Sequence, residues 1–308
     1  MKTILTDSVK TAAKVIKNGG ITAFPTETVY GLGANVYDEK AVGKIFKAKG
    51  RPADNPLIVH IADKKSLEVL TAEIPEYAAK IIKQFFPGPI ALIFKKNGIV
   101  PDIVTAGLDT IAVRMPSSKI ALKLIRECQT PIAAPSSNLS GSPSPTGFLH
   151  VLHDLNGKIP CILIGPKAKY GIESTVVDCT GRHPVILRPG VITLEQLKKI
   201  NKNVRFQNKT AKIKSPGQKY RHYAPGNGKT GKAKAKSKKT AFIGFDKTQS
   251  GCFDIVIICR TNEEYAKNLF SFFRQCDMKG IKTIYCQKVT ETGVGLAIMN
   301  RLRKAMYN

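Results

Sequence analysis

Three basic residues stand immediately before a proline-rich loop in the first third of the chain. They are Lys47, Lys49 and Arg51, and the segment KGRPADNPLIVH then enters an apolar run that ends at His60. Clustered cations on a constrained loop suit a polyphosphate, because arginine can bind two phosphate oxygens at once and lysine adds a point charge. Taken singly, a Lys-x-Arg pair is more often a solvated basic turn, and a lone histidine is more often structural.

A second segment, APSSNLSGSPSPT (134–146), follows a short apolar run and is crowded with hydroxyl groups. Such hydroxyls, the amide of Asn138 and loop N–H groups can surround a phosphate or a carboxylate. On composition alone, a flexible Ser/Pro loop explains the segment equally well. It is not a Walker loop, since G-x-x-x-x-G-K-[ST] is absent, and Gly31-Leu32-Gly33 lacks the third glycine of a dinucleotide fingerprint.

The segment PTETVYGLGA (25–34) follows an expected buried strand. Gly31 and Gly33 would let a ligand approach the backbone closely. For two glycines alone an ordinary strand-to-loop turn is the better explanation. Glu27, between two threonines, favours the wall of a polar pocket.

Single charged residues interrupt or border several apolar strands. Arg114 lies in TIAVRMP, Glu173 precedes STVVDC, and Arg188 lies in VILRPG. A buried arginine is costly unless it meets an anion, so each marks either a bound anion or a structural ion pair, with even odds. No cluster of His, Cys and Asp has the spacing of a metal site.

The elements that must position these residues alternate between helices and strands, which indicates an α/β fold. Strict alternation fails after residue 160, where three strand candidates come close together, so a mixed sheet is favoured over a purely parallel one. The helix candidates run from a cap at Thr6 or Asp7 to Asn18, and over 74–86 and 119–128. The strand candidates cover 21–25, 90–94, 110–116, 131–136, 161–165, 174–179 and 185–190.

A smaller α/β unit is expected at the C-terminal end. Its strand candidates cover 240–245, 253–259 and 282–287, and its helix candidates cover 262–280 and about 294–306. The pattern indicates a βαβ arrangement of the Rossmann-like kind. The chain is therefore expected to comprise a first domain over 1–205, a linker over 206–239 and a second domain over 240–308.

The linker carries much of the positive charge. The chain has 49 Lys and Arg against 22 Asp and Glu, a formal charge of +27, and residues 209–239 hold eleven Lys and Arg and no acid. The Lys-rich stretch 229–239 reads best as a solvated tether, and a phosphate-seeking segment is the alternative. In SPGQKYRHYAP (215–225), Tyr223 and its basic neighbours Lys219, Arg221 and His222 combine aromatic and cationic groups suited to stacking on a base.

The amino-acid composition limits the classes of protein that are compatible with the sequence. Apolar residues make up 43% and charged residues 23% of the chain, as in ordinary globular proteins. The seven cysteines are scattered without a C-x-x-C pair, which argues against a disulfide framework and favours a reducing compartment. The longest apolar runs are too short to span a bilayer, and the N-terminus lacks a signal-peptide pattern. A cytoplasmic protein without membrane contact is expected.

Taken together, the motifs resemble the YrdC-like L-threonylcarbamoyl-AMP synthase family in its long, two-domain form. PTETVYGLGA, KGRPADNPLIVH, RMP, APSSNLSG, IESTVVD, LRPG and SPGQKYRHYAP occur in one order over residues 1–225, and GVGLAIMNRLRKA (293–305) resembles the end of the second domain. The resemblance implies a YrdC-like domain with a twisted mixed sheet and flanking helices. The expected second domain is shorter than is typical of the long form, and the insert 229–239 is unusual.

The resemblance also implies an activity. L-threonine, bicarbonate or CO2, and ATP with Mg²⁺ would give L-threonylcarbamoyl-AMP and pyrophosphate. Downstream transferase machinery would then modify the tRNA adenosine next to the anticodon, and tRNA contact is a further expectation. The implied catalytic set is Lys49, Arg51, Ser136 and Asn138. The implied threonine pocket is Thr28, His60, Arg114, Ala134 and Ser174, and the implied nucleotide contacts are Arg51, Asn55, Thr110, Ser136, Ser144, Arg188 and Tyr223.

Two other functions are compatible with parts of the sequence. An RNA-binding module without catalytic activity would use the basic charge and predicts tight, salt-sensitive RNA binding without nucleotide turnover. YrdC-like domains also occur in hydrogenase-maturation carbamoyltransferases, but those carry acylphosphatase and zinc-finger segments that this chain lacks. The synthase is the leading hypothesis.

Overall fold

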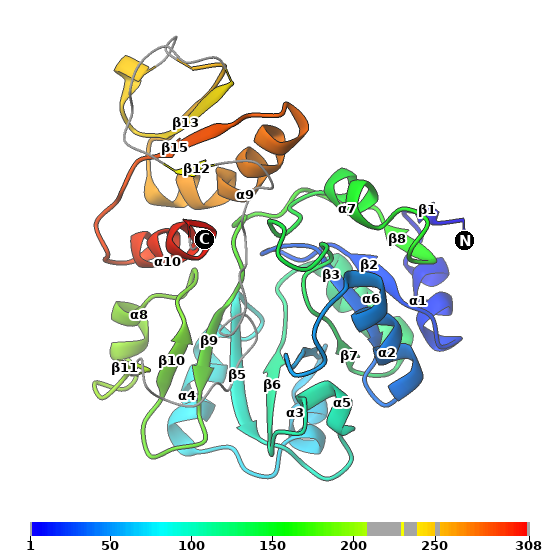
Figure 1. Ribbon diagram of the computed structural model, residues 1–308. Coiled ribbons are helices and arrows are strands. Elements are labelled where there is room, and N and C mark those ends of the chain that lie inside the picture. The colour runs from blue at the N-terminus through cyan, green and yellow to red at the C-terminus, as the bar shows by residue number, and fades with distance from the viewer. Residues whose placement is uncertain (1, 208–228, 231–238, 250–252, 307–308) are drawn as a thin grey trace.

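A computed structural model describes residues 2–207, 229–230, 239–249 and 253–306. The strands of residues 4–206 form one eleven-stranded sheet, in the order β1-β8-β2-β3-β7-β4-β6-β5-β9-β10-β11 (Figure 1). Its strands are β1 (Ile4–Thr6), β2 (Thr22–Phe24), β3 (Gly31–Asn35), β4 (Ile58–His60), β5 (Ile90–Lys95), β6 (Thr110–Arg114), β7 (Ile132–Ala133), β8 (Cys161–Leu163), β9 (Thr175–Asp178), β10 (Val185–Arg188) and β11 (Arg205–Phe206).

The large sheet is mixed, as the irregular alternation after residue 160 predicted. The pairs β1–β8, β2–β8, β4–β6, β5–β9 and β10–β11 are parallel. The pairs β2–β3, β3–β7, β4–β7, β5–β6 and β9–β10 are antiparallel. The register places His60 at the end of β4 directly opposite Arg114 at the end of β6. Two polar side chains from distant segments therefore meet at one place in the sheet.

Amphipathic helices cover this sheet. In α1 and α6, Ala12, Ile16, Leu124 and Ile125 are buried and share a core cluster with Phe24. The helices of this part are α1 (Val9–Lys17), α2 (Glu39–Lys49), α3 (Lys64–Leu70), α4 (Glu76–Phe85), α5 (Asp102–Thr105), α6 (Lys119–Cys128), α7 (Phe148–Leu155) and α8 (Leu194–Lys198). No helix in the described ranges is long and apolar enough to cross a membrane.

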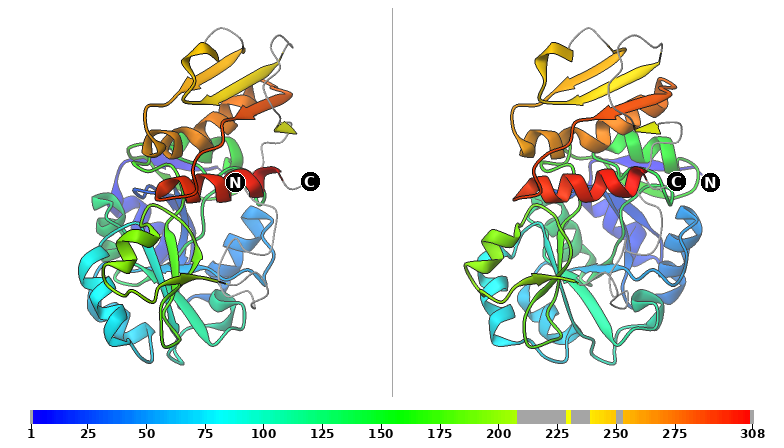
Figure 2. Two further views of the ribbon diagram at one scale, coloured as in Figure 1. Left: turned by 90° about the vertical axis from the view of Figure 1, so that its left-hand side faces the viewer. Right: turned by 60° about the vertical axis from the view of Figure 1, so that its left-hand side comes forward.

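The C-terminal unit, residues 229–306 as far as they are described, has its own core around the buried side chains of Tyr265, Phe270, Phe272 and Phe273. Its four-stranded sheet has the order β12-β15-β13-β14, with every pair parallel. Helices α9 and α10 lie between this sheet and the first part of the molecule (Figure 2). The elements are β12 (Lys229–Thr230), β13 (Thr240–Gly244), β14 (Ile255–Ile258), α9 (Asn262–Met278), β15 (Thr283–Cys286) and α10 (Val294–Met306).

Three local expectations are wrong. The first helix is capped by Ser8, whose hydroxyl accepts the N–H of Thr11, and residues 4–6 form a strand instead of leading into a cap. Residues 31–35 form strand β3 instead of a turn. A Cβ on Gly33 would lie 2.6 Å from Ile132 and 2.8 Å from Phe24, so this glycine is needed for packing within the sheet and not for approach to a ligand.

Candidate active site

A single cavity collects most of the polar groups singled out above. Its walls come from the segment after β2, the end of α2, the ends of β4 and β6, the loop 134–144 after β7, and the start of β9 with the end of β10. The lining residues are Thr26, Thr28, Val29, Gly31, Lys49, Arg51, Pro56, Ile58, His60, Arg114, Ala134, Pro135, Ser136, Asn138, Ser140, Ser142, Ser144, Glu173, Ser174 and Arg188.

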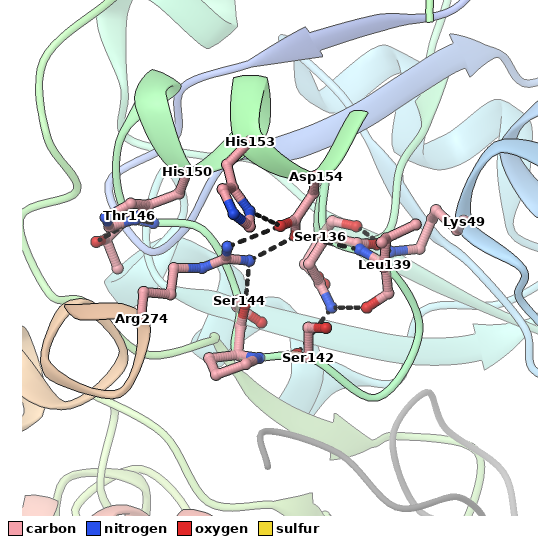
Figure 3. A network of polar contacts seen from close by, with 12 residues as sticks. Lys49, Ser136, Leu139, Ser142, Ser144, Thr146, His150, His153, Asp154 and Arg274 are labelled. Carbon is pink, nitrogen blue, oxygen red and sulfur yellow. Dashed lines mark hydrogen bonds and ion pairs between the residues drawn. The ribbon is translucent and has the colours of Figure 1, made fainter. Parts of the chain in front are cut away.

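Lys49 ties the end of α2 to the loop after β7. Helix α2 ends at Gly50, which adopts a left-handed conformation, and Lys49 in its last turn is only 3% exposed. Its ammonium donates to the carbonyls of Ser136 and Asn138, at 2.5 Å each (Figure 3). Burial, and then the charge of Arg51, lowers the pKa of Lys49 well below its usual value. An anion in the cavity would favour the charged form of this lysine.

The loop after β7, to which Lys49 donates, is also stabilised by hydrogen bonds between its own residues. Ser136 donates to Asn138 Oδ1 at 2.5 Å, and Asn138 Nδ2 donates to the carbonyls of Leu139 and Ser142 at 2.7 and 2.9 Å (Figure 3). Asn138 is 5% exposed. The side chains of this motif therefore shape the loop as well as facing the cavity.

Arg51 begins the loop after α2. Its Nε donates to the carbonyl of Asn55 at 3.2 Å, and its Nη2 donates to the carbonyl of Pro56 at 2.9 Å. These bonds hold the half-buried guanidinium against the cavity beside Lys49. Two cations at one end of a cavity are suited to neutralise phosphate charge.

Arg114 pairs with a carboxylate of the protein and also lines the cavity. Its Nη2 lies 2.6 Å from Glu27 Oε1, its Nη1 donates to Thr28 at 2.8 Å, and its Nε donates to the carbonyl of Gly88 at 3.3 Å. Burial opposes ionisation of Glu27, but the charge and hydrogen bond of Arg114 hold its pKa below the usual value. These bonds use three of the five N–H groups of Arg114, so two remain for a ligand.

His60 faces Arg114 across the strand pair and is 4% exposed. Burial, and then the charge of Arg114, lowers its pKa to about 3. The imidazole is therefore neutral at physiological pH. Its Nδ1 has no hydrogen-bond partner among the described residues, so this buried atom can receive a polar group of a ligand in the cavity.

We expect His60 to make the protein less stable in acid. The unfolded state takes up a proton near pH 6.5, whereas the folded state resists it down to about pH 3. The stability that depends on neutral His60 is therefore fully present above pH 6.5. As the pH falls from 6.5 toward 3, this one group lowers the free energy of unfolding by up to ~1.4 kcal/mol per pH unit. Urea unfolding at several pH values should show a shallower acid dependence for His60→Gln than for the wild type. Parallel curves would contradict the buried, neutral state of His60.

Glu173 and Arg188 form the opposite wall. Arg188 Nε donates to the carbonyl of Ser174 at 3.1 Å, and its Nη2 donates to the Ser174 hydroxyl at 3.2 Å. Glu173 Oε1 accepts the hydroxyl of Ser144, and its Oε2 lies 3.0 Å from Arg301 Nε. Burial opposes ionisation of Glu173, but the charges of Arg301 and Arg188 hold its pKa below the usual value. Glu173 therefore remains ionised although it is buried in this wall.

The cavity contains most of the candidate residues chosen from the sequence. Asn55 and Thr110 do not line it: Asn55 adjoins it through the bond from Arg51, and Thr110 pairs with Lys95 at the far end of β6 from Arg114. Tyr223 and its neighbours Lys219, Arg221 and His222 lie outside the described residues. Those brought together are Thr28, Lys49, Arg51, His60, Arg114, Ala134, Ser136, Asn138, Ser144, Ser174 and Arg188.

Several lining residues were not among the candidates. Ser140 and Ser142 belong to the hydroxyl-rich loop, whose composition is the signal that could have selected them. Glu173 was noted as a charge beside an apolar strand but was not assigned to the site. Thr26 could have been found from its place beside Glu27, since its hydroxyl lies 2.9 Å from that of Thr28.

A mixed α/β fold whose cavity is lined by cationic and hydroxyl side chains is typical of a protein class suited to polyanionic ligands. Two family models match the chain: residues 14–190 match the Sua5, YciO and YrdC model described as telomere recombination, and residues 192–306 match the C-terminal domain of threonylcarbamoyl-AMP synthase. Together the two models cover nearly the whole chain.

Individual relatives agree with the family models. A threonylcarbamoyl-AMP synthase of Pyrococcus abyssi is 48% identical over 96% of this chain and 93% of its own, and one of Bacillus subtilis is 44% identical over 96% and 91%. The crystal structure of P. abyssi Sua5 complexed with L-threonine superposes with a TM-score of 0.91 and 45% identity, covering 99% of this chain and 97% of that one. The chain belongs to the threonylcarbamoyl-AMP synthase family in its two-domain Sua5 form, which confirms the resemblance drawn from the motifs.

Proposed function

We propose that this protein is an L-threonylcarbamoyladenylate synthase, a nucleotidyltransferase that acts in tRNA modification. It condenses L-threonine, bicarbonate or CO2, and ATP to L-threonylcarbamoyl-AMP and pyrophosphate. The observation that carries the proposal is the cavity: in a chain related over nearly its whole length to such synthases, it joins the pocket around Arg114 to a cation-rich end around Lys49 and Arg51.

The reaction requires the protein mainly to position the reactants. The neutral amine of threonine adds to CO2, forming an N–C bond and losing a proton, and the product is a carbamate. A carbamate oxygen then attacks the α-phosphorus of ATP, while the bond from that phosphorus to the bridging oxygen breaks and pyrophosphate leaves. Such a step needs little covalent work from the enzyme and gains from aligned reactants and neutralised charge.

We assign threonine to the pocket formed by Thr28, His60, Arg114, Ala134 and Ser174, all of which line the cavity. The two remaining N–H groups of Arg114 suit the carboxylate of threonine. The neutral imidazole of His60 suits a hydroxyl or an amine and would not compete as a charge. The P. abyssi relative, whose structure is a complex with L-threonine, supports this choice of substrate.

We assign ATP to the end of the cavity that holds Lys49, Arg51, Ser136, Asn138, Ser144 and Arg188. The catalytic set within it is Lys49, Arg51, Ser136 and Asn138. Lys49 and Arg51 would neutralise phosphate oxygens, and Ser136 and Asn138 would fix the loop against them. Asn55, Thr110 and Tyr223 remain predicted nucleotide contacts, the first through the loop that Arg51 holds.

Magnesium is proposed to enter with ATP. Within the described residues no group of three His, Cys, Asp or Glu side chains is placed to hold a metal, and both carboxylates near the cavity are engaged by arginines. This donor set fits Mg²⁺, which is commonly held by substrate phosphates with few protein ligands. When bound, it neutralises charge on the phosphates. Glu173 and Asn138 would supply oxygen ligands only by giving up the hydrogen bonds that they accept from Ser144 and Ser136.

The division of the chain is proposed as a catalytic domain over 1–205, a linker over 206–239 and a small domain over 240–308. The large sheet ends with β11 at Phe206, and the small core begins with β13 at Thr240. Strand β12 lies within the linker range but pairs with β15. We further propose a cytoplasmic location, tRNA contact, and transfer of the product by a downstream threonylcarbamoyl transferase.

Pyrophosphate release tests the function. With ATP, Mg²⁺ and bicarbonate, release should depend on L-threonine, and L-serine should support much less of it. An RNA-binding module without activity would instead bind RNA in a salt-sensitive way and release no pyrophosphate with any amino acid. That second pattern would overturn the proposal.

A further inference from the structure

Two arginines of the C-terminal unit reach into the wall of the cavity. Arg274 extends from α9 and Arg301 from α10, and both are almost completely buried, at 6% and 0% exposure. Neither lines the cavity. Each pairs with a carboxylate of the first domain, and each carboxylate in turn binds the loop that carries Asn138 and Ser144.

Arg274 holds this loop at two points. Its Nη1 and Nη2 lie 3.0 and 2.7 Å from the two oxygens of Asp154 in α7 (Figure 3). Asp154 Oδ2 also accepts the N–H of Leu139 at 3.3 Å, immediately after Asn138. The same Nη2 donates to the carbonyl of Pro143, immediately before Ser144. One guanidinium thus fixes both ends of the stretch 139–143.

Arg301 reaches the same loop through a different carboxylate. Its Nε lies 3.0 Å from Glu173 Oε2, and its Nη1 donates to the carbonyl of Pro189 at 2.6 Å. The other oxygen of Glu173 accepts the hydroxyl of Ser144. Pro189 directly follows Arg188, which lines the cavity. The second arginine therefore supports the far end of the loop and the strand end beside it.

A loop of this composition needs such support. The stretch 134–146 contains five serines and three prolines and is not part of a helix or strand beyond β7. Catalytic groups must be held within a fraction of an ångström, and a loop positions them less well than a strand does. Arginine remains charged at every relevant pH and forms bidentate pairs, so it is well suited to a permanent clamp.

We propose that Arg274 and Arg301 are positioning residues through which the C-terminal unit holds the loop 138–144 in its ATP-binding form. The proposal rests on the function proposed above. It gives this unit a defined role on the nucleotide side, since the contacts lead to Asn138, Ser144 and Arg188. The contacts of Arg274 do not lead to the threonine pocket, whereas Arg301, through Glu173, also adjoins Ser174 of that pocket.

The test measures the KM for each substrate separately. We expect Arg274→Met to raise the KM for ATP between about tenfold and a hundredfold and to change the KM for threonine less than twofold. Arg274→Lys keeps the positive charge but loses the planar guanidinium that binds both carboxylate oxygens. Its KM for ATP should lie between those of Arg274→Met and the wild type. Arg303→Met is the matched control, since Arg303 lies in α10 and pairs only with the exposed Glu291 among the described residues. It should match the wild type.

Because Arg274→Met leaves the buried Asp154 without its arginine partner, a second variant is needed as a control for misfolding. Arg274→Met with Asp154→Asn removes both charges, keeps an acceptor for the N–H of Leu139 and should raise the KM for ATP as well. If these variants lowered only the amount of active enzyme and left both KM values unchanged, Arg274 would be merely structural and the proposal would be wrong.

Hydrogen exchange gives a readout that is independent of activity. Peptides covering 138–144 should exchange faster in Arg274→Met than in Arg303→Met or the wild type, while peptides from β5 and β6 should be unchanged. Equal exchange in all three proteins would overturn the positioning role. A wild-type enzyme without threonine-dependent turnover would instead contradict the proposed function, so the two failures are distinguishable.

Discussion

Arg51→Ala is expected to abolish pyrophosphate release while leaving the fold intact. The arginine lies at the cation-rich end of the cavity beside Lys49, whose ammonium cannot replace a bidentate guanidinium. Loss of a group that stabilises charge on a transferring phosphoryl typically lowers kcat about 10³-fold or more. The guanidinium is half-buried and donates, among its contacts, to the carbonyls of Asn55 and Pro56, so its removal should lower stability by about 1–3 kcal/mol and leave the protein folded.

The matched control is Lys47→Ala. Lys47 lies in the last turn of α2, two residues before Lys49, but its side chain is exposed and does not line the cavity. Initial rates of pyrophosphate release and thermal unfolding should be measured for both variants. Near-normal turnover in Arg51→Ala would exclude the phosphate-binding role, and equal losses in both variants would indicate a general effect of surface charge.

Arg114→Met should have the largest effect on stability. The substitution removes the partner of Glu27, whose carboxylate is 7% exposed and lies 2.6 Å from the guanidinium. Leaving one charge of a buried pair without its partner costs about 3–5 kcal/mol. The free energy of unfolding in urea should fall by that amount at neutral pH. The fall should be smaller in acid, where protonation of Glu27 removes the unpaired charge.

A double variant separates the ion pair from the substrate site. Arg114→Met with Glu27→Gln should recover much of the lost stability, because no unpaired charge remains. It should still bind threonine poorly, since the carboxylate of the substrate would have no arginine. Recovery of threonine binding along with stability would show that Arg114 serves the fold alone.

Part of the regular structure was predictable from the sequence, whereas helices α2, α3, α5, α7 and α8 and strands β1, β3 and β11 were not expected. Helix α6 begins and ends at the predicted residues, because Ser118 caps it and Gln129 adopts a left-handed conformation at its end. The strands β5, β6 and β9 follow the apolar runs that predicted them. Strand β3 was missed because two glycines resemble a turn, and the neighbouring side chains of Phe24 and Ile132 explain them.

The sequence predicted which residues form the site but not which groups they contact. The motifs selected Arg114 and Glu27 in separate segments, and the sequence left open whether the arginine meets a ligand or the protein. The structure shows that it meets the protein at Glu27 and lines the cavity as well. Arg274 pairs with Asp154, and Arg301 pairs with Glu173. The partners of each pair are more than a hundred residues apart in the sequence, so no local pattern predicts these pairs.

The most direct test of the proposed function is the composition of the product. Purified protein is incubated with ATP, Mg²⁺, L-threonine and ¹³C-bicarbonate, and the adenylate is examined by mass spectrometry before it decays. The account predicts one threonine- and bicarbonate-dependent product that contains AMP, threonine and a single labelled carbon, and that is absent with Arg51→Ala. An adenylate without the labelled carbon, or no adenylate from a folded wild-type protein, would contradict it.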